Sequence, residues 1–172
     1  MKNIICKLFL SVSFILLLSS CGYQVGSLMH PQVKTIAVAP IKNETRYPFL
    51  SAFMRGSLCE QYQLDGSLKV KQLDTADCII FGRIIDVQVR GSSEDSYDGE
   101  QTYRAAEWNV RVTMEFVVMI PGRKKPLVAK RRVVGTANFQ VMADQAITKR
   151  RGIQQACRDA AKKAVVYTTE AW

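Results

Sequence analysis

The stretch Ala106–Val118, AEWNVRVTMEFVV, decides the fold because its side chains alternate between apolar and polar almost throughout. One side is apolar and consists of Ala106, Trp108, Val110, Val112, Met114, Phe116 and Val118. The other side is mostly polar and consists of Glu107, Asn109, Arg111, Thr113 and Glu115. A period of two over this length predicts a β-strand with one face in the core and one polar face. Such strands are typical of antiparallel sheets that are covered on one side only.

Two further long strands are predicted on either side of this stretch. The first is Cys78–Arg90, whose core face is expected to hold Ile79, Phe81, Ile85, Val87 and Val89, interrupted by Arg83. The second is Leu127–Val141, which follows the turn signal Pro121-Gly122 and is expected to run back along Ala106–Val118. Its predicted core face consists of Leu127, Ala129, Val133, Ala137, Phe139 and Val141. Its predicted outer face consists of Lys130, Arg132, Thr136, Asn138 and Gln140, and Arg131 falls on the core side, where it needs a local explanation.

Shorter strands and two helices account for the remaining periodic segments. Val33–Pro40 predicts a first strand, and Leu68–Val70 predicts a short one. Between them, a helix is expected to begin at Pro48 and to end at Asp65-Gly66. Asp144–Thr169 predicts a long final helix with Asp144 as its N-cap. The predicted buried stripe of that helix consists of Ala146, Ile153, Ala156, Cys157, Ala160, Ala164 and Val165.

The order strand, helix, three strands, helix predicts an α+β fold. We expect a two-layer sandwich in which two helices pack on one face of a mostly antiparallel mixed sheet of about four strands. Residues 33–172 are predicted to form this single domain.

The N-terminus predicts export. Lys2 and Lys7 precede an apolar run, residues 8–18, and Ser19-Ser20-Cys21 follow it, which is the order of a secretory signal peptide. The run is shorter than the ~20 residues that a membrane span needs. Leu18-Ser19-Ser20-Cys21 resembles the lipobox of bacterial lipoproteins, which implies removal of residues 1–20 and acylation of Cys21. Residues 21–32 would then be the lipidated N-terminus and a linker, and Gly22 would permit transfer to the outer membrane. The alternative is an ordinary secretory signal that ends near a cysteine.

The positive charge of the chain points to anionic partners. The 172 residues carry a formal charge of +9, and loss of Lys2 and Lys7 with the signal peptide leaves +7. In an exported protein the available anions are lipid phosphates, acidic glycolipids and acidic protein surfaces, so nucleic acid is excluded as a partner.

This charge is concentrated in residues 121–151, with nine basic residues against the single acidic residue Asp144. The candidate contacts for an anionic glycolipid are Arg123, Lys124, Lys125, Lys130, Arg132, Lys149 and Arg150, since such groups bind phosphate well. The alternative is a surface that only keeps the protein soluble. The polar strand face with Asn109, Arg111 and Thr113 has two interpretations as well: it faces water, or it faces the polar lumen of a large outer-membrane barrel.

Residues for catalysis and metal binding are scarce. His30 is the only histidine, so the chain lacks the side chain that most often serves as a catalytic base or as a zinc ligand. We therefore predict no enzyme activity, no metal and no cofactor beyond the lipid on Cys21. Cys59, Cys78 and Cys157 remain after the signal and the lipid are assigned. They form either one disulfide and a free thiol or three small core residues.

Several segments along the chain resemble the LPS-assembly lipoprotein family, LptE. These are Cys21-Gly22-Tyr23-Gln24, residues 33–38, Asn43-Glu44-Thr45, Pro48, residues 65–68, Glu107-Trp108-Asn109-Val110, residues 135–139 and Glu170-Ala171-Trp172. The resemblance implies an outer-membrane lipoprotein, with its domain on the periplasmic side, that sits as a plug inside the large β-barrel protein LptD. It also implies that the two place lipopolysaccharide in the outer leaflet and that the lipoprotein binds the glycolipid. The acidic loop Gly91–Gln101 departs from the family, in which this connection can be basic.

A second resemblance leads to a different class of function. Ile36-Ala37-Val38-Ala39-Pro40 followed by Asn43-Glu44-Thr45 is also similar to the opening of curli-secretion and penicillin-binding-protein-activator lipoproteins. Those proteins act through protein–protein contacts, as a pore subunit or as a synthase activator. The co-purifying partner distinguishes the two alternatives.

Overall fold

The computed structural model describes residues 32–92, 107–140 and 145–170. The predicted signal peptide, Cys21, the acidic loop beyond Ser92 and the predicted N-cap Asp144 lie outside these residues. The elements are β1 (Thr35–Val38), β2 (Lys42–Asn43), α2 (Leu50–Asp65), β3 (Lys69–Val70), β4 (Cys78–Ser92), β5 (Glu107–Met119), β6 (Val128–Gln140) and α3 (Gln145–Thr169).

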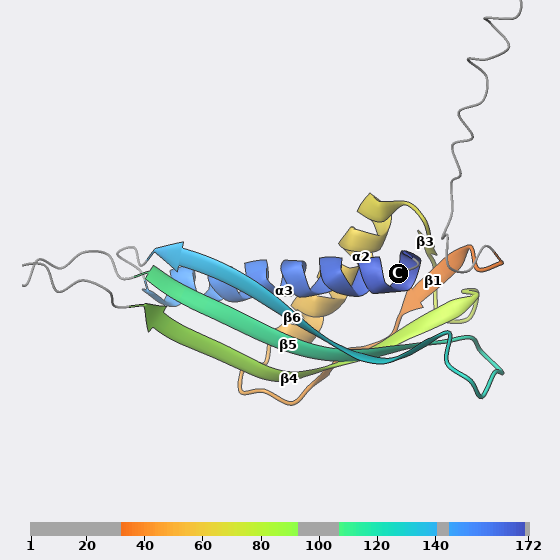
Figure 1. Cartoon of the computed structure of the whole chain (residues 1–172), viewed down its shortest axis with the longest axis horizontal. Coiled ribbons are helices and arrows are strands. Elements are labelled where there is room, and N and C mark those ends of the chain that lie inside the picture. The colour runs from red at the N-terminus through yellow and green to blue at the C-terminus, as the bar shows by residue number, and fades with distance from the viewer. Residues whose placement is uncertain (1–31, 93–106, 141–144, 171–172) are drawn as a thin grey trace, which may run out of the picture.

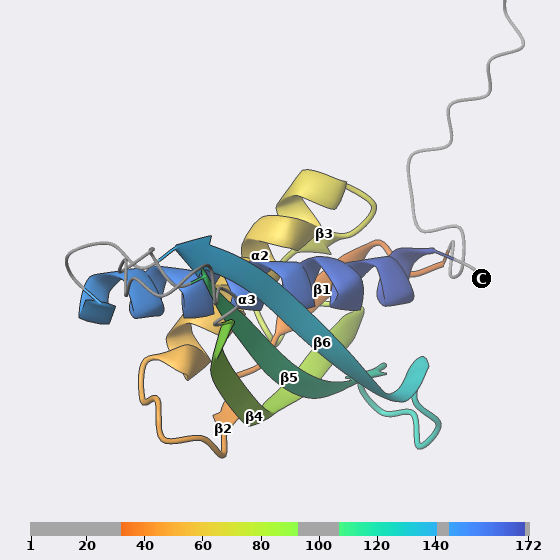
Figure 2. The ribbon, with the colours of Figure 1, turned by 60° about the vertical axis from the view of Figure 1, so that its left-hand side comes forward.

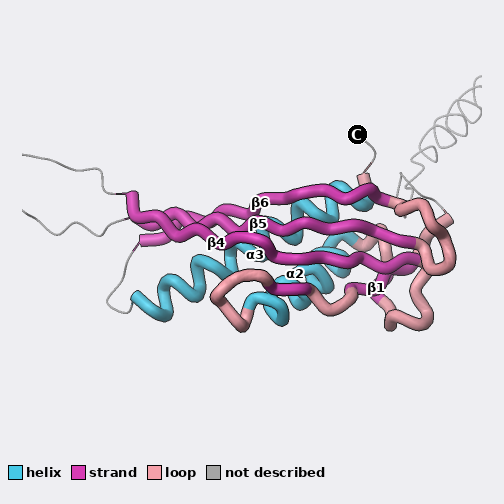
Figure 3. Tube along the Cα trace, turned by 90° about the horizontal axis from the view of Figure 1, so that it is seen from below, coloured by secondary structure: helices cyan, strands magenta, loops and turns pink. Residues whose placement is uncertain are grey.

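The fold is the predicted α+β sandwich, with both helices on one face of the sheet (Figures 1 and 2). The strand order is β3-β1-β4-β5-β6, and β2 pairs with β4 beyond the end of β1. The long strands form the antiparallel pairs β4–β5 and β5–β6. The short strands form the parallel pairs β3–β1, β1–β4 and β2–β4. The sheet therefore has six strands rather than about four. β3 is the short strand predicted at Leu68–Val70, which the predicted order did not count, and β2 was missed because its two residues have no periodicity to detect. Figure 3 shows the long strands side by side with the helices behind them.

The sheet has two ends that differ in their connections. At the end that we call proximal, β1 begins, β5 turns into β6 and α3 finishes, so it adjoins the start of the described chain (Figure 1). At the distal end β4 and β6 finish and α3 begins.

The predicted core face of β4 is wrong in its first half. Ile80 and Ile84 are fully buried, whereas Phe81 is 45% exposed on the other face. A bulge between Ile84 and Asp86 then shifts the register, which places Val87 against the core, as predicted. Apart from Arg83, the first half is apolar on both faces, so its sequence gives little sign of which face is covered, and an extra residue then reverses the pattern.

The start of β6 is also shifted relative to the prediction. Val128 is buried and Ala129 is exposed, since the β5–β6 register changes between Phe116 and Val118. Arg131 does face the helices, and its guanidinium carbon lies 5.0 Å from the centre of the Tyr167 ring on α3. This cation–π contact is the local explanation that the sequence demanded.

The helices lie very close to the sheet. On α3 the predicted stripe from Ile153 to Val165 is buried, but Ala146 is exposed. Gly135 on β6 has no room for a side chain, because a Cβ there would overlap the Ala156 carbonyl oxygen and lie 2.5 Å from the Ala160 nitrogen. The small residues of α3 and β6 thus allow a close backbone approach.

On α2 the helix begins at Leu50 after Phe49, and Gly66 ends it with a left-handed φ of 72°.

The three cysteines of the described residues are unpaired, so the core alternative applies rather than the disulfide. Cys78 and Cys157 are buried and Cys59 is half-buried. Burial raises the pKa of the Cys78 and Cys157 thiols to about 12, which keeps them protonated and unreactive.

Candidate functional site: the uncovered face of the sheet

Among the described residues, neither helix packs on the outer face of the long strands. Asn109, Arg111 and Thr113 point to this face, as predicted, because Val110 and Val112 between them are fully buried. The Asn109 amide donates to the Asn138 amide oxygen across the β5–β6 pair at 2.6 Å. This part of the face is therefore polar, and a cross-strand hydrogen bond joins two of its side chains.

The centre of this face is a carboxylate that three cations share. Glu115 on β5 has a side chain only 9% exposed, and its two oxygens accept from Arg83 Nη2 at 2.7 Å and Arg132 Nη2 at 2.8 Å. Lys130 Nζ lies 2.8 Å from the same carboxylate. We call these four residues the Glu115 cluster. The hydrogen bonds from Lys130, Arg132 and Arg83 lower the pKa of Glu115 from 4.5 to about 2.

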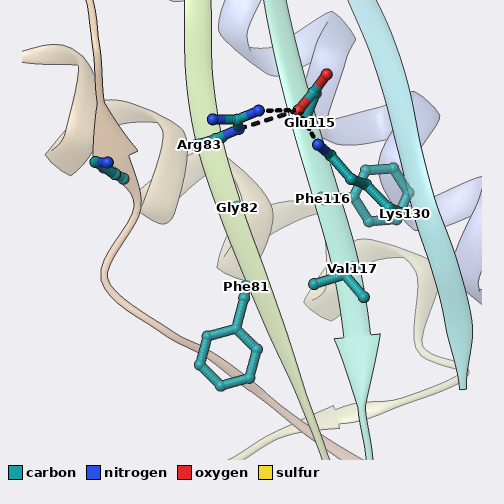
Figure 4. A pocket seen from close by; sticks show the side chains of 8 residues that line it. Phe81, Gly82, Arg83, Glu115, Phe116, Val117 and Lys130 are labelled. Atoms are coloured by element: carbon teal, nitrogen blue, oxygen red, sulfur yellow. Dashed lines mark hydrogen bonds and ion pairs between the residues drawn. The ribbon is translucent and has the colours of Figure 1, made fainter. Parts of the chain in front are cut away.

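An open hollow adjoins the Glu115 cluster (Figure 4). Its volume is about 240 Å³. The lining consists of Lys42, Phe81, Gly82, Arg83, Glu115, Phe116, Val117 and Lys130. In Figure 4 the side chains of Phe81 and Val117 lie on one side of the hollow and the ion pairs on the other. The hollow thus offers an apolar surface beside fixed charges.

Among the described residues, no group of three or more His, Cys, Asp or Glu could hold a metal ion. No helix in the described part of the chain is long and apolar enough to span a membrane. The uncovered face is a charged surface with an open hollow beside the Glu115 cluster.

Comparison with known families identifies the chain. Residues 33–166 match the family model LptE, described as lipopolysaccharide-assembly. This chain belongs to the LptE family. The match covers the sheet and nearly all of both helices, so the uncovered face belongs to the family domain.

Two solved structures with TM-scores of 0.50 and 0.51 show the same fold at low identity. A PelC dodecamer from Paraburkholderia phytofirmans has a TM-score of 0.51 and 14% identity, with 81% of this chain and 90% of that chain covered. A protein from Xanthomonas campestris has a TM-score of 0.50 and 12% identity, with coverage of 79% and 85%. The rare lipoprotein B from Shewanella oneidensis is 20% identical with a TM-score of 0.36, with coverage of 74% and 86%. At these identities the first two show the fold alone. No curated protein matches the chain.

The fold divides the predicted glycolipid contacts of this LptE-family chain into three groups. Arg123, Lys124 and Lys125 are exposed on the β5–β6 turn at the proximal end. Lys130 and Arg132 belong to the Glu115 cluster on the sheet. Lys149 and Arg150 lie on the opposite side of the sheet, early in α3, near aromatic rings of the segment before α2 and its first turn.

Sequence reasoning missed Arg83, Phe81 and Lys42 as members of the site. A signal for Arg83 existed, because β4 and β5 pair Arg83 directly with Glu115, and β5 and β6 pair Glu115 with Arg132. Placing the strands in register would have brought these charges together. This register between β4 and β5 does not continue along the whole strand, because the bulge between Ile84 and Asp86 shifts it by one residue. The sequence contained no sign of that bulge.

Proposed function

We propose that this chain is an outer-membrane lipoprotein, anchored through Cys21, whose uncovered sheet face docks inside a large LptD-type barrel. Together the two would insert lipopolysaccharide into the outer leaflet. The observation that carries this proposal is the uncovered face of the sheet in a domain of the LptE family. One face is covered by two helices, and the other is left to a partner.

The chemistry of the uncovered face supports a polar, water-filled partner. A barrel lumen is lined with polar side chains, so a face that enters it needs satisfied charges rather than an apolar surface. Glu115 meets this need, since it neutralises part of the charge of Arg83, Lys130 and Arg132. Phe81 and Val117 beside it provide an apolar contact at the centre, where interfaces gain most of their binding energy.

Binding of the glycolipid would use the basic side chains predicted from the sequence. Of the three groups, Lys130 and Arg132 already pair with Glu115 and have the least charge to offer. Among the described residues, no carboxylate pairs with the turn residues or with Lys149 and Arg150 of α3, so these are the better candidates.

The anchor is tested by Cys21→Ala. Without the thiol there is no site for the acyl chains, so the variant should lose its association with outer membranes or stall in processing. Recovery of the variant in the outer-membrane pellet at the wild-type level would contradict the anchor.

Docking to the barrel is tested by Phe81→Asp, with Leu64→Asp as a matched control. Both replace an exposed apolar side chain by a carboxylate, but Phe81 lies on the uncovered face and Leu64, 72% exposed, lies on α2. The wild type should co-purify with a large barrel in mild detergent, as identified by mass spectrometry. Phe81→Asp should reduce the barrel yield about tenfold, and Leu64→Asp should leave it unchanged.

Two results would overturn the docking proposal. One is the recovery of rings of the chain itself, or of a peptidoglycan synthase, in place of a barrel. The other is an equal loss of barrel in both variants, because a contact through the uncovered face predicts an effect of Phe81→Asp alone.

A further inference from the structure

A cluster of aromatic and basic side chains lies on the helix side of the molecule, where the segment before α2 meets the start of α3. We call it the aromatic–cation cluster, and its members are Arg46, Tyr47, Phe49, Phe53, Lys149 and Arg150. Only the last two of these residues were predicted from the sequence as candidate contacts. The other four come from a separate part of the chain and reach them only through the fold.

The rings of the cluster form a continuous edge-to-face series. The Tyr47 and Phe49 ring centres are 6.1 Å apart with planes at 66°, and those of Phe49 and Phe53 are 5.5 Å apart at 88°. Three cations lie over this series. Arg46 is 6.0 Å and Lys149 5.5 Å from the centre of Tyr47, and Arg150 is 5.2 Å from Phe49 and 5.7 Å from Phe53.

Within the described residues, aromatic rings rather than carboxylates contact these cations. A ring attracts a cation through its quadrupole but carries no net charge, so the positive charge remains available to an anion. Arg46, Lys149 and Arg150 are exposed, and within the described residues none of them has a carboxylate partner. In the Glu115 cluster, by contrast, three cations share a carboxylate.

The combination of groups selects a particular ligand class. Guanidinium and ammonium groups bind phosphate oxygens by charge-assisted hydrogen bonds. Tyr47, Phe49 and Phe53 are half-buried, which leaves part of each ring for apolar contact. A phosphate attached to an apolar or sugar body fits this surface better than a free phosphate does.

The position of the cluster in the fold is consistent with such a ligand. Along α3, Arg150 precedes Thr169 at the proximal end by a rise of about 30 Å, at ~1.5 Å per residue. The hydrocarbon core of a bilayer is also about 30 Å thick. A domain that enters a barrel with its tethered, proximal end at the inner leaflet would therefore carry the cluster to the level of the outer leaflet.

We propose that the aromatic–cation cluster binds the phosphate of an anionic glycolipid, with Arg46, Lys149 and Arg150 contacting the phosphate and the rings contacting the adjoining body. This inference rests on the proposed function for the identity of the ligand. It goes beyond that function because it assigns the contact to one of the three basic groups and adds Arg46 and three rings.

The test compares two triple variants of the full lipidated chain that lose the same charge. Arg46→Gln/Lys149→Gln/Arg150→Gln removes the cations of the cluster, and Arg123→Gln/Lys124→Gln/Lys125→Gln removes those of the β5–β6 turn. Binding of fluorescent diphosphoryl lipid A in detergent is measured by anisotropy, and melting temperatures show that both variants are folded. The cluster variant should bind at least about tenfold more weakly, and the turn variant should stay within about threefold of the wild type.

Two further arms separate the phosphate from the body that carries it. Dephosphorylated lipid A should bind the wild type about as weakly as diphosphoryl lipid A binds the cluster variant. Inorganic pyrophosphate should compete only poorly. Phe53→Leu, which keeps an apolar side chain but removes the ring under Arg150, should weaken binding by a smaller factor than the triple substitution.

Equal losses in the two triple variants would overturn the proposal, because they would show a response to net charge alone. A loss confined to the turn variant, or pyrophosphate binding as tight as that of lipid A, would overturn it as well. Because no barrel is present in this assay, its result is independent of the co-purification experiment. A wild type that binds lipid A through the cluster but recovers no barrel would contradict the proposed docking and leave the cluster assignment standing.

Discussion

The same strands form a sheet whose two faces differ, since one is packed against helices and the other is uncovered. On the covered face, α3 approaches β6 so closely that Gly135 has no space for a methyl group. On the uncovered face, Glu115 of β5 pairs with three cations from β4 and β6 beside an open hollow. The covered face is specified by volume, and the uncovered face is specified by charge. A substitution should therefore have its main effect on stability in the first case and on association or pH response in the second.

The largest effect is expected from Gly135→Ala on the covered face. The added methyl would overlap the backbone of α3 at Ala156 and Ala160, so the helix must move away from the sheet. We expect the free energy of unfolding to fall by about 3 kcal/mol or more, measured by urea denaturation. Gly56→Ala is the control, because nothing lies within 4 Å of its Cβ position and the helix should gain up to about 1 kcal/mol. A Gly135→Ala protein as stable as the wild type would show that volume does not specify this face.

An intermediate effect is expected from Tyr62→Phe, between the two helices that cover the sheet. The Tyr62 hydroxyl is fully buried and donates to Thr168 Oγ1 at 3.1 Å, and the Thr168 hydroxyl donates to the Ala164 carbonyl. Loss of this one hydrogen bond, without loss of volume, should cost about 1 kcal/mol. Thermal unfolding at neutral pH measures it. A loss in the free energy of unfolding as large as that of Gly135→Ala would mean that buried hydrogen bonds matter as much as volume on the covered side of the sheet.

The smallest effect on stability at neutral pH is expected from Glu115→Gln on the uncovered face. Its three partners are 42–62% exposed, so water screens the repulsion that remains among them. The effect should appear instead in acid. Because the folded pKa of Glu115 is about 2 against an ordinary 4.5, its contribution is complete above pH 4.5 and is lost as the pH falls towards 2.

Urea denaturation across this pH range tests the Glu115 prediction. The wild type should lose stability more steeply than Glu115→Gln between about pH 4.5 and 2, since the amide has no proton to gain. Parallel curves for the two proteins would contradict the role of Glu115 as the shared anion. A neutral-pH loss larger than that of Gly135→Ala would reverse the comparison between the two faces.

Local regularities of the sequence were sufficient for most of the elements. The alternation of β5 correctly predicted its buried and polar faces, and the helical spacing with Gly66 predicted the end of α2. The same reasoning failed in β4 because Ile79 to Ile85 is apolar on both sides and contains the bulge. It also failed at Ala129, where the change in β5–β6 register shifts the start of β6. A bulge is decided by how two strands pair, so one strand alone contains no sign of it.

The candidate sites show the same division between local and distant information. The sequence alone shows the concentration of basic residues between 121 and 151. The fold divides the candidate contacts among them into three groups with different surroundings. Lys130 and Arg132 lie on a shared carboxylate, Lys149 and Arg150 lie on aromatic rings, and Arg123 to Lys125 stand on a turn. These surroundings come from residues far away in the chain.

By itself the sequence determined the signal-like N-terminus, the α+β class, the long amphipathic strands and the positive charge, because each depends on composition or on neighbours within a few residues. Only the tertiary structure decided which face of β4 is covered, why Gly135 must be small, and which cations share a carboxylate or lie over aromatic rings. The physical reason is that burial, close approach and neutralisation are relations between segments that meet only when the chain is folded. Glu115 illustrates it, since its partners come from strands on both sides.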